Sequence, residues 1–439
     1  MAAKTVVEVQ ETEKVINNMD EVDLSKLNAL KEKAKNQDMA AKIVGKKEKS
    51  WKFGVIGSGQ AGSRIASVFY EYGYDAVVVN TAMQDLKHIN VPEANKLLLE
   101  YGAGGAAKEL MIGHAAAEAH KDSIRSLIHD RLNDCHILIL CTSLGGGSGA
   151  GSVEVMVEIL SEMSKPLMVM TVLPMDSDDD QTKHNALETL SKLAKFTHEK
   201  KINNLIVIDN SKLEVLYGNV NQLDFFNTAN RAIVEPLDTF NTLSAMASAV
   251  KPLDPTELSK LLIGADGLTI YGELTVENYL DDTAIAEAIV SNLNSNLLAS
   301  GFDLKQSRYA GFIIAANKKV WSKIPSVSIT YASAMLQDAC GVPSIFKGIY
   351  EVDLKEDVVK VYSIFSGLGL PESRVAQLKK DAQEYMQRVK QKDEQRNVNL
   401  QLDTGVDQTV SAAQRVKEKM AQKSSAFGKL LGNVVDRRK

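Results

Sequence analysis

The chain has 439 residues, of which 44% are apolar, and a formal net charge of −5. This length allows about two domains plus extensions, the apolar content is that of a globular protein, and the acidic balance argues against nucleic acid as a partner of the body. No stretch approaches the length of a membrane span, and the first residues lack the apolar core of a secretory signal. The three cysteines follow no pairing pattern, so we expect a reduced protein of the cytoplasm.

A charged segment precedes the first apolar run. Residues 1–50 are rich in Lys, Glu, Asp and Asn, and the spacing over residues 23–30 predicts one or two surface helices, although a disordered tail fits the same composition. The β-branched run Trp51–Ile56 predicts a strand, followed by the glycine turn Gly57–Gly62 and a helical run, Ile65–Tyr72. A strand, a glycine turn and a helix in this order form the first unit of a parallel sheet.

The glycines of this first turn have the G-x-G-x-x-G spacing of dinucleotide-binding proteins. Dinucleotide binding also requires an acidic residue at the end of the second strand, to hold the ribose hydroxyls. The second strand, Ala76–Val79, ends instead in Asn80-Thr81, which leaves an NAD(P)-binding oxidoreductase as an alternative. The sequence contains no G-x-x-x-x-G-K-[ST] motif, so the phosphates of a nucleotide would be met mainly by backbone N–H groups and a metal ion.

Two further glycine clusters precede predicted helices. Gly102–Gly105 comes before the helical run Ala106–Ala119, and Leu144–Gly151 lies between the apolar strand Ile137–Cys141 and the amphipathic run Val153–Met163. A glycine loop between a strand and a helix directs backbone N–H groups and the positive end of the helix toward one place, which suits a phosphate. A flexible linker is the alternative for Leu144–Gly151, but linkers are rarely held between two strongly apolar elements.

Polar loops follow the next two predicted strands. Leu167–Leu173 is followed by the acidic run Pro174–Asp180, and Leu205–Ile208 is followed by Asp209-Asn210. Loops of this kind gather at the carboxyl edge of an open α/β sheet, where ligands bind. The acidic run therefore fits ribose or metal contacts, and equally a solvated loop.

The second half of the chain has a different pattern. Asp224–Val250 predicts one long helix that contains Asn230 and Pro236, and Pro236 is expected to kink or break it. Beyond this helix we expect a second α/β domain without a further glycine loop. Its predicted strands are Leu268–Val276, Tyr309–Ala316, Ile345–Val352 and Val358–Ser366, with helices at 283–298 and 326–339.

The C-terminal segment is strongly charged. Pro371–Lys392 predicts an amphipathic helix, and residues 398–414 are polar and turn-rich. Residues 415–439 carry eight basic and two acidic residues, a net charge of +6. This basic tail fits docking to an acidic partner, a neighbouring subunit or DNA, and it fits a solubilising tail equally well.

The order of the three glycine loops indicates a family resemblance. Gly145–Gly151, with the sequence GGGSGAG, resembles the tubulin signature GGGTGTG or GGGTGSG, and it follows a GxGxxG-like loop and a middle glycine loop at the matching distance. Residues 51–370 therefore resemble the tubulin/FtsZ superfamily of GTP-driven filament proteins. The N-terminal lead, the extended C-terminal helix and the basic tail look most like the TubZ/RepX group of plasmid- and phage-borne bacterial tubulins.

The resemblance implies a fold class and a division of the chain. The fold is α/β: a Rossmann-like parallel-sheet GTPase domain is joined by a long central helix to a second, smaller α/β domain, with helical N- and C-terminal extensions. The implied parts are an N-terminal helical extension at 1–50, a GTP-binding domain at 51–223, the central helix at 224–250, a C-terminal activation domain at 251–370, a C-terminal helix at 371–397 and a flexible basic tail at 398–439.

The resemblance also implies where GTP/GDP and Mg²⁺ bind. The first loop would meet the α- and β-phosphates, the middle loop would sense the γ-phosphate, and one acid of the 174–180 run would contact the ribose. Two asparagine amides would each offer a donor and an acceptor to the guanine edge. The implied nucleotide-binding residues are Gly57, Ser58, Gly59, Gln60, Ala61, Gly62, Asn80, Thr81, Ala103, Gly104, Gly105, Gly145, Gly146, Gly147, Ser148, Gly149, Asp178 or Asp179, Asn210 and Asn230.

A catalytic role is implied for Asp254 and Glu257. In the superfamily, the acids of the loop after the central helix enter the nucleotide pocket of the next subunit and position the attacking water. Asp254-x-x-Glu257 fits this pattern, but without the resemblance the same residues favour a helix N-cap with a capping-box glutamate. Pro252 stands where the family has Asn, which leaves a nonhydrolysing relative as an alternative.

Together these observations predict a GTPase that stacks head to tail and hydrolyses GTP between subunits, for the segregation of plasmid or phage DNA. The basic tail is expected to recruit a DNA-bound adaptor protein, and no membrane partner is expected. The alternatives are an FtsZ-like filament with a different cargo and the NAD(P)-binding oxidoreductase.

Overall fold

The computed structural model describes residues 48–102, 104–217, 222–293, 298–342 and 345–399. The helices expected within residues 1–47, the loop position Ala103 and the basic tail 415–439 lie outside these described ranges. The chain divides into two compact units, residues 1–382 and 383–439. Within the described ranges, no helix is both long enough and apolar enough to cross a membrane.

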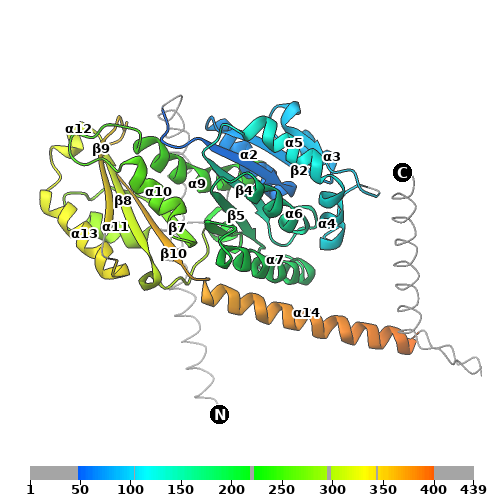
Figure 1. Cartoon of the computed structure of the whole chain (residues 1–439). Helices are drawn as coiled ribbons and strands as arrows, with labels where there is room; N and C mark the ends of the chain where they lie inside the picture. The colour runs from blue at the N-terminus through cyan, green and yellow to red at the C-terminus, as the bar shows by residue number, and fades with distance from the viewer. Residues whose placement is uncertain (1–47, 103, 218–221, 294–297, 343–344, 400–439) are drawn as a thin grey trace, which may run out of the picture. The chain divides into compact units, whose positions relative to one another are not determined.

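The strands of the described residues are β1 (Phe53–Ser58), β2 (Asp75–Asn80), β3 (Lys96–Leu98), β4 (Ile137–Ser143), β5 (Leu167–Leu173), β6 (Asn204–Asp209), β7 (Gly267–Val276), β8 (Tyr309–Ala316), β9 (Ile345–Glu351) and β10 (Val359–Leu368). They form one ten-stranded sheet in the order β3-β2-β1-β4-β5-β6-β7-β10-β8-β9 (Figure 1). The strands from β3 to β7 in this order pair parallel. β10 pairs antiparallel with both β7 and β8, and β8 pairs parallel with β9. The predicted α/β class is confirmed.

The helices of the described residues are α2 (Gly59–Glu71), α3 (Met83–Lys87), α4 (Leu110–Ala119), α5 (Lys121–Leu132), α6 (Ser148–Glu162), α7 (Asp180–His198), α8 (Ser211–Tyr217), α9 (Gln222–Leu243), α10 (Pro255–Ile263), α11 (Ala284–Ser291), α12 (Lys318–Trp321), α13 (Ser326–Cys340) and α14 (Glu372–Asn399). Two short 3₁₀ helices span Glu93–Asn95 and Leu304–Gln306.

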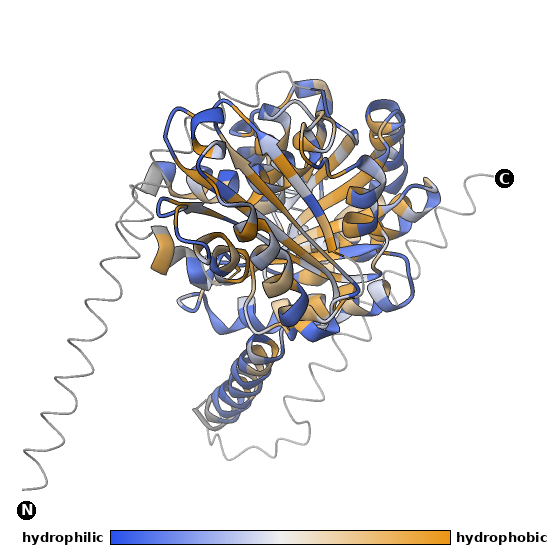
Figure 2. Ribbon diagram, turned by 90° about the vertical axis from the view of Figure 1, so that its left-hand side faces the viewer, coloured by the Kyte–Doolittle hydropathy of each residue, from blue (hydrophilic) through white to orange (hydrophobic). Residues whose placement is uncertain are grey.

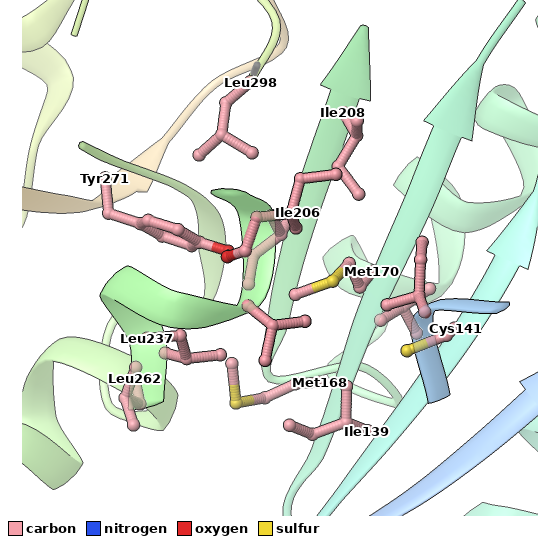
Figure 3. Packing of buried hydrophobic residues seen from close by; sticks show 14 of the residues in the cluster. Ile139, Cys141, Met168, Met170, Ile206, Ile208, Leu237, Leu262, Tyr271 and Leu298 are labelled. Carbon is pink, nitrogen blue, oxygen red and sulfur yellow. The ribbon is translucent and has the colours of Figure 1, made fainter. Parts of the chain in front are cut away.

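The parallel strands at the centre of the sheet are buried on both faces. Every residue of β1, β5 and β6 is buried, and successive side chains of a strand point to opposite faces, so helices cover both sides. Figure 3 shows side chains of β4, β5 and β6 packing against Leu237 of α9 and Leu262 of α10. In Figure 2, where each residue is coloured by its hydropathy, the central strands are mostly apolar and the outer helices carry many polar residues.

The two halves of the sheet meet at β6 and β7. These strands pair through Asn204 with Gly267 and Leu205 with Leu268. Helix α9 contacts both α2 and β7, and the buried Tyr271 hydroxyl of β7 donates a hydrogen bond of 2.9 Å to the carbonyl of Ile233 in α9. Helix α9 therefore connects the parallel part of the sheet to the mixed part that begins at β7.

The central helix is shorter than the sequence predicts. Helix α9 continues through Pro236 but ends at Leu243 rather than Val250. The helical bonds tighten at its end, where Met246 N donates to Leu243 O. The Ser248 hydroxyl then accepts from the backbone N–H groups of Val250 and Lys251. These local bonds replace helical ones and turn the chain toward β9, where Lys251 and Ile349 form a bridge. The C-terminal helix, in contrast, is longer than predicted: it ends at Asn399, beyond both Lys392, the end that the sequence pattern predicts, and residue 397, the end that the resemblance implies.

Candidate functional site

A cavity of about 510 Å³ opens at the carboxyl ends of β1, β4, β5 and β6. The structure brings eleven of the sequence-predicted site residues into its lining: Gly59, Gln60, Ala61, Gly105, Gly146, Gly147, Ser148, Gly149, Asp178, Asn210 and Asn230. Five further lining residues carry polar or aromatic side chains and are not among the predicted site residues: Arg64, Asp85, Lys108, Ser143 and Phe226.

Two glycine loops touch each other at the floor of the cavity. Gly59 has a left-handed backbone, with φ of +71°, and a Cβ there would lie 2.7 Å from Gly149 N. Two predicted residues lie beneath the cavity instead of lining it. A Cβ on Gly62 would overlap the Cys141 carbonyl, and a Cβ on Gly57 would lie 2.7 Å from Gly62 O. These two glycines let α2 approach the sheet, so their role in the described structure is packing.

The helices α2 and α6 begin at this floor and present unsatisfied N–H groups. Helix α2 begins at Gly59 and α6 at Ser148, and neither has a side-chain cap or an acidic residue in its first turn. The first N–H groups of a helix have no partner within the helix and carry its positive end. Two such ends at one cavity make a preorganised anion site, because no carboxylate of either first turn competes for them.

The predicted pair Asn80 and Thr81 supports the cavity from outside its lining. The Thr81 and Ser148 hydroxyl oxygens lie 2.5 Å apart, and Gly105 N donates to Thr81 O. The Asn80 amide donates to Asp85 Oδ2 at 3.0 Å. Gln60 donates to Asp85 Oδ1, also at 3.0 Å, so two amides orient the Asp85 carboxylate in the cavity wall.

The middle glycine loop leads to Lys108, a cavity-lining residue that was not predicted from the sequence. Gly104 and Gly105 have φ values of +89° and +76°, and Ala107 and Lys108, one residue further on, are also left-handed. The Lys108 ammonium bonds to the carboxylate of Asp179. A lysine three residues after a glycine cluster is a weak signal on its own, since most surface lysines have no such role. Gly145 of the signature loop lies just outside the lining and packs against Thr182.

The two candidate ribose acids have different surroundings. Asp178 lines the cavity, and its Oδ2 accepts from Met175 N at 2.8 Å. Asp179 is the N-cap of α7 and accepts from Thr182 N at 2.9 Å. Partial burial favours the neutral form of Asp179, but the hydrogen bonds from Lys108 and Thr182 outweigh it and lower the pKa to about 2. Of the two acids, Asp178 is therefore the one placed to contact a ligand.

Side chains from two helices form the far end of the cavity. Asn230 and Phe226 are one helical turn apart on α9 and both line the cavity, as does Asn210 after β6. The guanidinium carbon of Arg64 lies 4.9 Å from the centroid of the Phe226 ring. The i, i+4 spacing of Phe226 and Asn230 is a sequence signal that could have identified the aromatic residue.

Asp254 and Glu257 lie away from the cavity. They form a capping box at the start of α10: Glu257 N donates to Asp254 Oδ1 at 2.8 Å, and Asp254 N donates to Glu257 Oε2 at 3.2 Å. The Trp51 indole donates to the carbonyl of Pro255, which places this turn at the amino end of β1. The cavity is at the carboxyl end of β1, whose six residues span about 20 Å.

Two uncapped helix N-termini, the glycine loops between them and the amides of Asn210 and Asn230 in one cavity are features of a nucleotide-binding α/β protein. Residues 40–218 match the family model described as "Tubulin/FtsZ family, GTPase domain". Residues 239–379 match the model "Tubulin/FtsZ-like protein TubZ-like, C-terminal domain". The chain belongs to the tubulin/FtsZ family of GTPases, in its TubZ-like group, which confirms the predicted family and GTPase activity.

Relatives and solved structures agree with this assignment. The chain is 24% identical over 381 residues to the tubulin-like protein TubZ of Bacillus cereus, covering 79% of this chain and 85% of that protein. A GTPγS-form protofilament of TubZ from Bacillus thuringiensis serovar israelensis superposes with a TM-score of 0.71 at 19% identity, covering 80% of this chain and 95% of that one. A type III plasmid segregation TubZ gives a TM-score of 0.66 at 19% identity, with coverages of 82% and 95%. The dinucleotide alternative finds no support here.

Proposed function

We propose that this GTPase binds guanine nucleotide in the cavity, with the phosphates on the N-termini of α2 and α6 and the base at the far end. The observation that carries the proposal is the meeting of two uncapped helix N-termini in a cavity whose opposite end holds Asn210 and Asn230. Asparagine amides can donate and accept at once, as the guanine edge requires. Phe226 offers a flat apolar face for stacking, and Asp178, which also lines the cavity, is the carboxylate we assign to the ribose.

The lining residues also fit a magnesium ion bound together with the nucleotide. Among the described residues, no group of three or more His, Cys, Asp or Glu could hold a metal alone. Mg²⁺ does not need one, because it is usually held by one or two carboxylates, phosphate oxygens and water. Asp85 is the carboxylate we assign to it, since the amides of Gln60 and Asn80 already orient it. The ion would neutralise phosphate charge that the backbone N–H groups leave unmatched.

We propose that hydrolysis requires a second subunit. Asp254 is exposed and Glu257 is partly exposed, about one strand length from the cavity of their own chain. Head-to-tail stacking would bring this turn against the next subunit's cavity. The capping box engages one oxygen of each carboxylate, which leaves Asp254 Oδ2 to accept from a water, while Glu257 Oε1 lies 3.8 Å from the Lys251 ammonium. The turn would then act both as a helix cap and as the device that orients the attacking water.

The filament and its cargo follow by similarity. TubZ proteins of comparable fold form protofilaments, and one is described as a plasmid segregation protein. We propose that this chain forms head-to-tail protofilaments that segregate plasmid or phage DNA, with an adaptor protein bound to residues 415–439. An FtsZ-like filament with a different cargo is the alternative.

The test is to measure phosphate release from GTP against protein concentration, with light scattering recorded in parallel. We expect a sharp threshold below which both signals vanish, because half of the active site comes from the neighbour. Phosphate release proportional to protein concentration, without scattering, would mean a self-contained active site and would remove Asp254 and Glu257 from catalysis.

A further inference from the structure

The first turn of α14 reaches the two loops that carry the ribose and base candidates. Arg374 Nη2 donates to the carbonyl of Pro174 at 3.0 Å, and Nη1 donates to Asp176 Oδ1 at 3.2 Å. Arg374 Nε lies 3.1 Å from Asp209 Oδ2. One guanidinium thus joins the loop after β5 to the loop after β6, although Arg374 follows them by more than 160 residues in the chain.

Burial makes the loss of this contact costly. The side chains of Arg374 and Asp209 are only 10% and 5% exposed, whereas Asp176 is 70% exposed. The other oxygen of Asp209 accepts from the backbone N–H and the hydroxyl of Ser211, at 3.2 and 2.7 Å. A buried carboxylate with both oxygens engaged cannot rotate freely, and removing its cation would leave an uncompensated charge. The planar guanidinium fixes the directions of two hydrogen-bond acceptors, Pro174 O and Asp176 Oδ1, which an ammonium group cannot do. It pairs with Asp209 through charge alone, because Nε makes no hydrogen bond to any described residue.

Both loops lead directly into the cavity. Asp209 immediately precedes Asn210, and Asp176 lies between the lining residues Met175 and Asp178. The Met175 N–H donates to the Asp178 carboxylate, and the carbonyl of the same peptide group, Pro174 O, accepts from Arg374. Arg374 therefore holds the peptide group that orients Asp178. Arg374 itself does not line the cavity. Its effect on the cavity is indirect, through the two loops that carry Asp178 and Asn210.

A second attachment lies two helical turns further along α14. Lys183 donates to the carbonyl of Asp176 at 2.7 Å and lies 3.8 Å from the Asp381 carboxylate. Between the two attachments, Leu378 is fully buried. Positions 374, 378 and 381 share one helix face, so the start of α14 is attached to the loop after β5 at two polar points, with the buried Leu378 between them.

We infer that Arg374 is a positioning residue for the nucleotide and that the seating of α14 sets the affinity of the ribose and base end. The inference rests on the nucleotide placement proposed above. Its consequence is linkage: if the seated helix favours bound nucleotide, bound nucleotide must favour the seated helix to the same degree. Helix α14 is continuous to Asn399, so a partner that unseats its first turns would release nucleotide.

The experiment measures the affinity of the full-length protein for fluorescent GDP and for tripolyphosphate, below the assembly threshold. The variants are Arg374→Ala, Arg374→Lys and, as a matched control, Lys380→Ala, which removes an exposed cation from the same helix. We expect Arg374→Ala to weaken GDP binding by about tenfold or more, a size typical of coupling between sites. Arg374→Lys should fall between it and the wild type, and Lys380→Ala should match the wild type. Tripolyphosphate binding should stay unchanged in all of them, because its helix termini are not held by Arg374.

Hydrogen exchange over residues 372–382 gives a second readout. Bound GDP should slow exchange there in the wild type and not in Arg374→Ala. The inference is overturned if Arg374→Ala binds GDP like the wild type, or if it loses GDP and tripolyphosphate equally. If Arg374→Ala does not fold without nucleotide, Arg374→Lys decides, and wild-type affinity in that variant overturns the inference. Failure of the wild type to bind GDP would instead contradict the proposed nucleotide site itself.

Discussion

The two ends of the cavity differ in the groups that form them: backbone at one end and side chains at the other. The phosphate end consists of backbone: two helix N-termini and glycine loops so close that a single Cβ at Gly59 or Gly62 would strike a neighbouring segment. The base end consists of side chains, with Phe226 and Asn230 from α9 and Asn210 after β6, held from behind by Arg374. The first end is rigid because it is close-packed, and the second depends on contacts between segments far apart in the chain.

The largest expected effect comes from filling the glycine floor. In Gly62→Ala the new methyl group would overlap the Cys141 carbonyl, and backbone atoms on both sides cannot move aside cheaply. Because Gly62 lies within α2 with an ordinary φ, the whole cost is steric, and we expect a loss of about 3 kcal/mol or more in unfolding free energy. Denaturant unfolding of the nucleotide-free protein measures it.

Gly73→Ala is the matched control for this substitution. Gly73 has a left-handed φ of +86° but no atom within 4 Å of the added Cβ. Its cost is conformational alone, about 1–2 kcal/mol. Equal losses in the two variants would mean that the glycine floor is not close-packed.

The next effect concerns the turn at the opposite edge of the sheet. We expect Glu257→Ala to assemble to the wild-type polymer mass while phosphate release falls about 100-fold or more, the range for loss of a general acid–base group. Phosphate release and light scattering on the same sample measure both quantities.

Glu257→Gln separates catalysis from capping. Glutamine is also accepted at this position of a capping box, so it keeps the helix start but removes the carboxylate. We expect it to be as inactive as Glu257→Ala. Wild-type turnover by Glu257→Gln would show that the residue serves only as a helix cap.

A smaller effect distinguishes the two ends of the cavity directly. Phe226→Ala should weaken GTP binding by about 10- to 100-fold, since stacking of one base on an aromatic ring contributes about 1–3 kcal/mol. Tripolyphosphate binding should not change, because the α2 and α6 N-termini are untouched. The matched control is Phe225→Ala, which removes the neighbouring ring outside the cavity lining. A parallel loss of tripolyphosphate affinity in Phe226→Ala would contradict the division of the site.

This division also explains which parts could be predicted from the sequence. Glycine loops between apolar runs are local signals, because a left-handed or crowded backbone position selects glycine wherever it occurs. The parallel order of the sheet and the floor of the cavity followed from them. Lys108 and Arg374 gave no comparable signal, since a charged residue acquires its role only when folding brings a distant partner to it. The same reasoning applies to the end of α9, where Ser248 bonds override helical periodicity.

The smallest expected effect lies between the two ends, at the pair formed by Lys108 and Asp179. Asp179→Asn keeps a good N-cap for α7 but removes the charge that Lys108 neutralises. The folded-state pKa of Asp179, about 2, is below the unfolded value of about 3.9, so the ionised carboxylate stabilises the protein above pH 4. This contribution is lost as the pH falls from about 4 toward about 2. Since half of the Asp179 side chain is exposed, solvent screening limits this contribution to stability to less than about 1 kcal/mol.

Urea midpoints of the wild type and Asp179→Asn should therefore differ slightly at pH 6 and converge near pH 2. Lys108→Met should give the same profile, because it removes the other half of the pair. A difference that does not change with pH would mean that Asp179 acts through the shape of the loop, as the glycines of the floor do, and that its charge is irrelevant to stability.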